Sequence, residues 1–390
     1  MPRPQPQRRS LDVDLVEDDA GLARVRDDWE ALAAATRRPG SLPDLLIAWR
    51  RHVAPREALT RVVTVRDGGR LVGLAPFLVD RGPLGIAYAR MFGTPSLPQR
   101  SGILAAPGRE EEVVRLVARA LAASDPAPGV ISLQRIDAGA AAPSLLRRAW
   151  PEPLGARLHW HQREPAPVLS LAGRGYDDWL ATKGSRTRQK LRRARRRLAE
   201  RGVAFALAES PAEVAEALDA YRRMHGAHWG DRSRLWREPS MAMLREAAER
   251  LVPSGGMRLY LLRTADGIIS VEIVLAAGGE AALWNRGWDP AWARESASMV
   301  ALHDVIEHCF AVGDVRLDLG EKAQPYKLRL SDGDDPVAWA TLIPRGRSFP
   351  QAVVATAPER WRHRARAAAM RLPDPAVERI KAVRRRLAPA

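Results

Sequence analysis

The chain has 390 residues and a formal net charge of +16, with 46% hydrophobic and 28% charged residues. Single hydrophobic cores stop growing near about 250–300 residues, so this length and composition predict a globular protein of two domains. A membrane-spanning helix needs roughly 20 apolar residues, and the longest apolar run, Ile268 to Ala277, is interrupted by Glu272. The single cysteine, Cys309, excludes an internal disulfide framework and favours the reducing cytoplasm.

The charge is unevenly distributed along the chain. Residues 1–10 are basic and proline-rich and lead into acidic residues, which predicts a disordered leader rather than a secretory signal. Most of the excess cations lie between Lys183 and Arg201 and beyond Arg345. A cationic surface attracts polyanions whatever the fold, but this distribution argues against nucleic acid as the main partner without excluding it.

In chain order, the first part of the sequence predicts a strand at 11–15, a helix at 22–33 and a second helix at 45–52. Two strands, 61–67 and 70–79, flank Asp67-Gly68-Gly69 and form a hairpin pattern. A helix at 110–123 and a strand at 130–135 follow. The stretch from 106 to 112 lacks obvious catalytic side chains, so we expect this half to be architectural.

The second part repeats the same order. Helices are predicted at 212–229 and 240–251, strands at 257–263, 268–276 and 281–288, then a helix at 296–312 and a strand at 315–319. Residues 62–73 parallel residues 259–270, each as strand, turn and strand. We therefore expect an α/β fold with mixed sheets in two similar halves, 11–165 and 166–346, and a basic helical tail at 347–390. Coincidence is the alternative, because a hairpin followed by a helix is common.

A family resemblance rests on a series of motifs in the second half. They are Tyr176–Leu180, Ser185–Leu198, Met224-His225 with Trp229, Gly287-Trp288-Asp289, Leu317–Gly320 and Tyr326-Lys327. The series resembles a bacterial GNAT-like family that includes cellulose-biosynthesis-type acetyltransferases and is similar in fold to Fem-type peptidyltransferases, which have two GNAT-like halves. The resemblance implies transfer from acetyl-CoA or another acyl-CoA to an amine, often on an amino sugar or a polysaccharide precursor.

The late helix is the predicted cofactor end of the site. The first N–H groups of a helix lack partners and its dipole favours anions, so its start suits the pyrophosphate of CoA. We expect Ser296, Ala297, Ser298 and Met299 to contact the cofactor, with Arg294 adding charge. The family usually has Ser-Pro-Gly here, whereas this chain has Ser-Ala-Ser. The alternative is that a serine only caps the helix.

Glu272 is the leading candidate for the base that deprotonates the acceptor amine. It interrupts an apolar strand, so its carboxylate is either at a cleft, desolvated with a raised pKa, or at a solvated edge. His225 is a cleft residue by resemblance, with packing against Trp229 as the alternative. Its spacing to His228 could suit a metal, but no third ligand is evident, so no metal is expected.

Three further residues close the predicted site. Asp318 points away from its apolar strand neighbours, and we expect it to be catalytic. Tyr326 could protonate the leaving thiolate, as a phenol commonly does in GNAT enzymes, and Lys327 could bind a phosphate or an anionic group of the acceptor. The resemblance adds Trp229 and Asp289 as substrate contacts. A tyrosine next to a proline-containing turn is as often simply packed.

The basic helix at 183–201 has an apolar stripe of Leu191, Ala194 and Leu198, and its cations, Arg192 among them, could bind an anionic substrate or form a solvated face. For the tail, the most specific expectation is peripheral contact with anionic lipid. Two alternative functions remain open: Fem-type transfer from aminoacyl-tRNA, and a non-enzymatic basic protein that binds nucleic acid or membrane.

Overall fold

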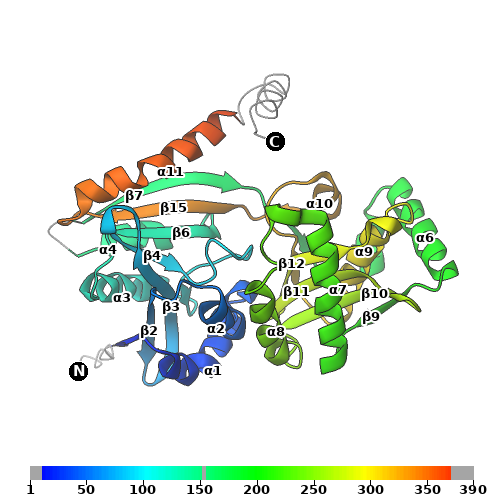
Figure 1. Ribbon diagram of the computed structural model, residues 1–390, viewed down its shortest axis with the longest axis horizontal. Helices are drawn as coiled ribbons and strands as arrows, with labels where there is room; N and C mark the ends of the chain where they lie inside the picture. Colours follow the sequence, from blue (N-terminus) through cyan, green and yellow to red (C-terminus); the bar gives the residue numbers. More distant parts are fainter. Residues whose placement is uncertain (1–10, 152–154, 370–390) are drawn as a thin grey trace, which may run out of the picture.

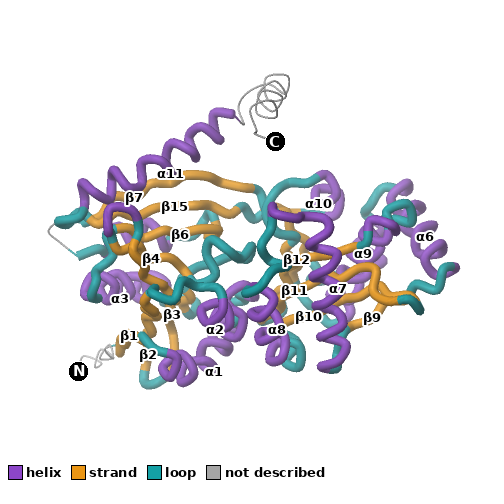
Figure 2. Tube along the Cα trace, in the orientation of Figure 1, coloured by secondary structure: helices purple, strands orange, loops and turns teal. Residues whose placement is uncertain are grey.

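The computed structural model describes residues 11–151 and 155–369, which form two mixed sheets side by side, each covered by helices (Figures 1 and 2). The first half contains β1 (Asp12–Val16), α1 (Asp19–Ala35), α2 (Pro43–His52), β2 (Leu59–Asp67), β3 (Arg70–Arg81), β4 (Ala87–Met91), β5 (Leu104–Ala105), α3 (Glu110–Ala123), β6 (Val130–Asp137), α4 (Ala142–Ala149) and β7 (Ala156–Glu164).

The second half starts with β8 (Pro167–Ser170), α5 (Tyr176–Ala181), α6 (Ser185–Glu200), β9 (Ala204–Leu207), α7 (Pro211–Trp229) and α8 (Ser240–Leu251). It continues with β10 (Met257–Thr264), β11 (Gly267–Ala277), β12 (Glu280–Trp288), α9 (Ala297–Ala311), β13 (Arg316–Asp318), α10 (Pro325–Leu330), β14 (Gly333–Asp334), β15 (Val337–Pro344) and α11 (Phe349–Ala369). The predicted elements of both halves are present, with ends within a few residues of those expected.

The two sheets share one internal topology. In the first, β2, β3 and β4 are antiparallel and β4 then pairs in parallel with β6; in the second, β10, β11 and β12 are antiparallel and β12 pairs in parallel with β13. The β2–β3 hairpin and the β10–β11 hairpin are the two segments that align in the sequence. This confirms the predicted fold of two similar mixed α/β halves.

The first sheet is completed by a strand from the second half of the chain. The sheet orders are β1-β2-β3-β4-β6-β15-β7, with β5 beside β3, and β14-β8-β13-β12-β11-β10-β9. The segment expected to form the second half, 166–346, thus contributes β15 to the first sheet. β15 is buried along its whole length because β6 and β7 flank it and α4 and α11 contact it, with apolar clusters on both of its faces. An apolar strand of this kind can complete either sheet, so its sequence does not reveal which one.

Helices from the two halves pack on each other. Helix α2 contacts α8, and one apolar cluster includes Trp29 and Trp49 from the first half with Met241 and Leu244 from the second. Burial of large apolar side chains is the main favourable term in such packing. The shared core fixes the position of one sheet relative to the other, and it places the loops of the first half against β12 and β13.

The two basic segments occur as helices. Leu191, Ala194 and Leu198 of α6 are buried against α9, as their stripe predicted. Helix α11 packs on β7 and β15, while the expected leader and the part of the tail after residue 369 lie outside the described residues. Cys309 is buried in an apolar cluster, which agrees with a structural thiol. Over 11–151 and 155–369, no helix has the length and apolar character required to cross a bilayer.

Candidate active site between the two halves

The parallel strands β12 and β13 separate along their length. They pair only from Glu280 opposite Arg316 to Ala282 opposite Asp318. Beyond this point β13 ends, whereas β12 continues to Trp288, and α10 follows β13 after a short loop. The separation creates an opening with Arg286 of β12 on one side and Tyr326 and Lys327 of α10 on the other, and all three line the same cavity.

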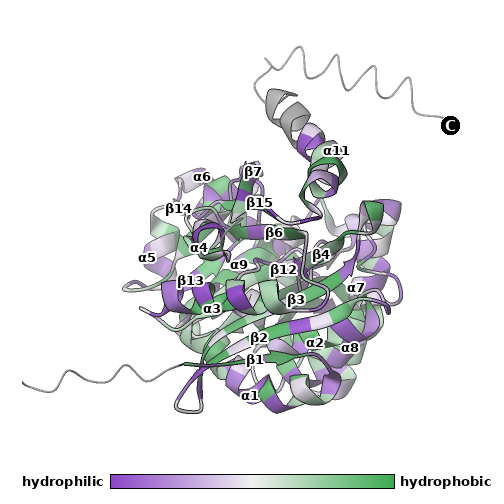
Figure 3. Ribbon diagram, turned by 90° about the vertical axis from the view of Figure 1, so that its left-hand side faces the viewer, coloured by the Kyte–Doolittle hydropathy of each residue, from purple (hydrophilic) through white to green (hydrophobic). Residues whose placement is uncertain are grey.

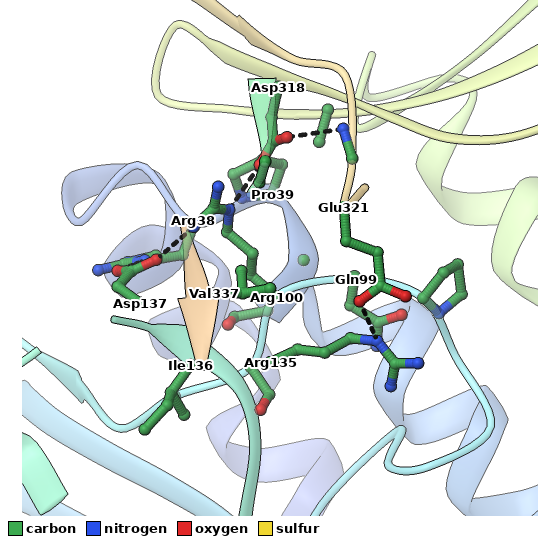
Figure 4. A pocket seen from close by; sticks show the side chains of 18 of the residues that line it. Arg38, Pro39, Gln99, Arg100, Arg135, Ile136, Asp137, Asp318, Glu321 and Val337 are labelled. Atoms are coloured by element: carbon green, nitrogen blue, oxygen red, sulfur yellow. Dashed lines mark hydrogen bonds and ion pairs between the residues drawn. The ribbon is translucent and has the colours of Figure 1, made fainter. Parts of the chain in front are cut away.

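This cavity has a volume of about 260 Å³ and lies between the halves (Figure 4). The first half lines it with residues 37–41, 98–104 and 135–137, and the second with residues 280–286 and 318–321. Trp284 Nε1 donates a hydrogen bond to Gln99 Oε1 over 3.2 Å, which joins the two walls. The first half was expected to be architectural, but it forms one complete wall of the cavity.

Glu272 and Arg286 form a buried ion pair next to this opening. The Glu272 side chain is 0% exposed, and its Oε1 atom lies 2.7 Å from Arg286 Nη2. Burial raises the pKa of Glu272 to about 7, although Arg286 opposes the shift. β11 lies inside the sheet between β10 and β12, so a solvated edge position is excluded and the desolvated alternative is correct.

Arg286 connects Glu272 to the start of α9. Its Nη2 atom also donates to the carbonyl oxygen of Ser298 over 2.9 Å and to Ser298 Oγ over 2.6 Å. The guanidinium lies over the rings of Trp288 and Tyr326, at 5.2 and 5.9 Å from their centroids. Sequence reasoning missed Arg286. The available signal was a cation on a strand directly opposite Glu272, but recognising it requires the register of β11 and β12, which contains an irregularity.

Tyr326 and Lys327 occupy the far side of the opening. Burial raises the pKa of Tyr326, with Arg286 acting in the opposite direction. Lys327 is buried, and its Nζ donates to the carbonyl oxygens of Gly320 and Glu321 over 3.0 and 2.8 Å. Burial lowers the pKa of Lys327 to about 8. An ammonium has three N–H donors, so one remains for a ligand.

Asp318 lies in the cavity wall, but its carboxylate is already engaged. Oδ2 accepts from Arg100 Nε over 2.5 Å and Oδ1 from the Gly320 N–H over 2.7 Å. Arg100 also binds Asp137 Oδ1 over 2.8 Å, and Arg38 pairs with Asp137 (Figure 4). The predicted catalytic role of Asp318 is therefore less consistent with the geometry than a role in joining the halves.

His225 supports β12 from outside the cavity. A carbonyl oxygen can only accept, so Nδ1–H donates to the Arg286 carbonyl over 3.1 Å and Nε2 accepts from the Ser233 hydroxyl over 2.9 Å. Burial lowers the pKa of His225, which favours this neutral ring. Trp229 packs near His225 and His228. The geometry favours the packing alternative, and among the described residues no cluster of three metal-binding side chains occurs.

The start of α9 is open. Ser296 has the left-handed backbone angles φ 63° and ψ 33°, and no side chain caps the helix. Within the described part of the chain, the N–H groups of Ala297 and Ser298 have no acceptor. The alternative of a capping serine is therefore not seen, and the free N–H groups suit an anion.

Other predicted residues near α9 have structural positions. Ala297 is buried under α6 with Val300, and Met299 packs partly against the same cluster, so the small size of Ala297 serves helix packing. Asp289 Oδ1 accepts from the Ala291 N–H over 2.9 Å and caps the short 3-10 turn Pro290–Trp292. Arg294 is exposed beside the open helix start.

Helix α6 holds the loop before α9 in place. Arg201 pairs with Glu295 over 2.5 Å and lies 3.9 Å from the centroid of the Trp292 ring. Arg195 pairs with Asp304 and Glu307 of α9 over 2.6 and 2.5 Å. Arg192 is exposed and is not one of the residues that line the cavity. The structure therefore does not bring Arg192 together with the other predicted site residues.

Comparison with known proteins is consistent with this arrangement. The profile of the Acetyltransferase (GNAT) domain matches residues 185–328. No curated protein sequence matches significantly.

Three solved structures share the fold over most of the chain. FemX has a TM-score of 0.61 at 10% identity, covering 84% of this chain and 98% of FemX. The C-terminal domain of a protein named as a lysylphosphatidylglycerol synthetase, from Agrobacterium fabrum, has a TM-score of 0.55 at 13% identity, covering 85% and 94%. L-PGS from Bacillus licheniformis has a TM-score of 0.52 at 12% identity, covering 84% and 95%.

These likenesses extend over both halves, whereas the domain match lies in the second half, where the open start of α9 and the Glu272–Arg286 pair are found. The chain is therefore a GNAT-fold protein with two GNAT-like halves, the second of which contains the region that matches the GNAT domain.

Proposed function

We propose that the protein is an acyl-CoA-dependent N-acyltransferase, with acetyl-CoA as the first donor to test and an amine as the acceptor. The observation that carries the proposal is the buried Glu272–Arg286 pair, which lies at the first turn of α9 and next to the opening between β12 and β13. This arrangement combines a carboxylate of raised pKa, a fixed cation and an anion-binding helix start.

The donor would use the second half. The free N–H groups of Ala297 and Ser298 and the dipole of the 15-residue helix α9 suit its pyrophosphate. Arg294, exposed beside this helix start, adds a cation. From there the opening between β12 and α10 leads to Arg286 and Tyr326, so the thioester would lie near those two side chains.

The chemistry needs a neutral amine that attacks the thioester carbonyl, and the carbon–sulfur bond then breaks. With a pKa of about 7, Glu272 is about half ionised at neutral pH and can accept the amine proton. Arg286 stands between Glu272 and the cavity, so this proton would pass through an intervening water. Tyr326, which stays protonated because its pKa is raised, would give a proton to the leaving thiolate.

The acceptor would enter the cavity between the halves. Arginines and one lysine outnumber the carboxylates in its lining, and Lys327 keeps one N–H free. A pocket with an excess of cations in its lining favours an anionic ligand. The acceptor is therefore an amine that also carries a carboxylate or a phosphate, and amino sugars linked to a nucleotide are the first compounds to test.

The test measures thiol release from several acyl-CoAs with amino sugars and nucleotide-linked amino sugars as acceptors. Glu272→Gln should lower kcat by about 10²–10⁴-fold and leave CoA affinity within about twofold, because general-base catalysis is lost while the donor contacts remain. Absence of thiol release with every donor, together with absence of CoA binding, would refute the proposal.

A second donor, aminoacyl-tRNA, is supported by one observation. Helix α6 exposes Arg186, Lys190, Arg192, Arg193, Arg196 and Arg197 on the side away from α9. A row of exposed cations binds the phosphate backbone of RNA in a salt-dependent way. Salt-sensitive binding of aminoacyl-tRNA, with acyl transfer from it and none from acyl-CoA, would favour this donor.

A further inference from the structure

The three most exposed large apolar side chains of the described residues lie on or beside α11. Trp361, Leu84 and Val354 are 70, 64 and 63% exposed. Val354 and Trp361 belong to α11 and Leu84 to the 3-10 turn Pro83–Gly85, which α11 contacts. We call these three side chains the α11 patch.

Helix α11 has two apolar sides, and only one of them is used by the fold. Ala352 and Thr356 face inward and pack with Phe349 and Val353 near Ile343 of β15. Val354 and Trp361 are seven residues apart and therefore lie on one face of the helix. They remain exposed, and α11 stands out from the body of the molecule (Figure 3). In the described part of the chain, the side of α11 that carries Val354 and Trp361 is therefore left largely exposed.

The charge around the α11 patch is strongly positive. Residues 337–369 contain six arginines and a single acidic residue, Glu359. Arg345, Arg347 and Arg362 are exposed, as is Arg157 of β7, which lies opposite Ile343 on the face of the sheet that α11 covers. Residues 370–390 add six basic and two acidic residues to the sequence that follows.

Exposed apolar and cationic groups together match one kind of surface. Tryptophan favours the interface between headgroups and acyl chains, and arginines near the surface are attracted to anionic lipids. We propose that α11, with Leu84 beside it, docks the protein on an anionic lipid bilayer. Trp361 and Val354 enter the interface and the neighbouring arginines contact the headgroups.

Comparison with the other basic helix, α6, shows why α11 rather than α6 is the proposed lipid-binding surface. It is more cationic than α11, but its apolar residues Leu191, Ala194 and Leu198 are buried against α9. Its exposed side therefore offers charge without an apolar group to insert. Lipid docking through α11 is independent of the acyl-transfer proposal, because binding to vesicles is measured without any turnover.

The experiment is flotation of the full chain with vesicles of phosphatidylcholine alone or with about one third phosphatidylglycerol. The wild type should float with the anionic vesicles, and the double variant V354S/W361S should bind at least about 10-fold more weakly because the inserted groups are lost. Val312→Ser is the matched control, since Val312 is 48% exposed at the end of α9, away from this patch. It should bind like the wild type.

The thermal transition of each variant reports whether it is folded like the wild type. Equal vesicle binding by V354S/W361S and wild type would overturn the proposal, as would equal binding to neutral and anionic vesicles. A concentration-dependent dimer that W361S abolishes, without vesicle binding, would assign the α11 patch to self-association and would also overturn it.

Discussion

Replacing Arg286 by methionine should move the pH dependence of catalysis rather than abolish it. The side chain lies 2.7 Å from Glu272 and holds down the pKa of this buried carboxylate, which is nevertheless about 7. An opposite charge at short range lowers a carboxyl pKa by about 1–3. Without Arg286, the pKa of Glu272 should therefore rise to about 8 or higher.

The expected loss of rate follows from the ionised fraction of Glu272. With a pKa of about 7, about half of the base is ionised at pH 7. With a pKa of about 8 or 9, the fraction falls to about one tenth or one hundredth, so kcat/KM at pH 7 should fall by about 5-fold or about 50-fold. At pH 9 most or half of the base is ionised again, and the loss should be correspondingly smaller.

The assay is kcat/KM for thiol release between pH 6 and about 9.5. Arg286→Lys is the control that keeps the cation, and its profile should lie near that of the wild type. Glu272→Gln should lower the rate without a pH-dependent recovery, because no base remains to ionise. A loss in Arg286→Met that is equal at every pH would refute the reasoning and leave Arg286 as a support for the Ser298 turn alone.

The remaining predictions concern the donor, the joint between the halves and the acceptor. Ser298→Asp should weaken CoA binding by about 10-fold in calorimetry without lowering Tm. The reason is that an acidic group in the first turn of α9 repels the pyrophosphate but interacts favourably with the helix dipole. An unchanged CoA affinity would exclude this turn as the pyrophosphate site. Arg100→Leu should lower the free energy of unfolding by about 3 kcal/mol at pH 7, because it leaves Asp137 and Asp318 without their shared cation. Arg100 and Arg38 hold the pKa of Asp137 below its usual range, so this stabilisation is present above that range and is lost on acidification. The difference between variant and wild type in urea unfolding should therefore shrink at low pH, and a constant difference would contradict it. For Lys327, whose pKa is about 8, the acceptor KM should rise as the pH passes 8 and the ammonium loses its proton. Lys327→Arg should remove this rise and Lys327→Met should raise KM throughout; a wild-type KM that is independent of pH would exclude contact between Lys327 and the acceptor.

Local sequence was sufficient for the elements and for the duplication. Hydrophobic periodicity and turn residues act over a few positions, so α8, the β10–β11 hairpin and α9 could be predicted close to their observed ends. The same local reasoning singled out Glu272, because a carboxylate in an apolar strand is unusual wherever the strand pairs. The start of α9 was also predictable as an anion site, since every helix leaves its first N–H groups open.

Only the tertiary structure decided which groups meet. The addition of β15 to the first sheet, the pairing of Arg286 with Glu272 and the closure of the cavity by the first half all depend on contacts between distant segments. Arg100 binds Asp318 across 218 positions of sequence, and this contact turned a predicted catalytic acid into part of the joint between the halves. The physical reason is that a side chain's type sets the chemistry it can do, whereas its desolvation and its charged partners are set by packing of the whole chain.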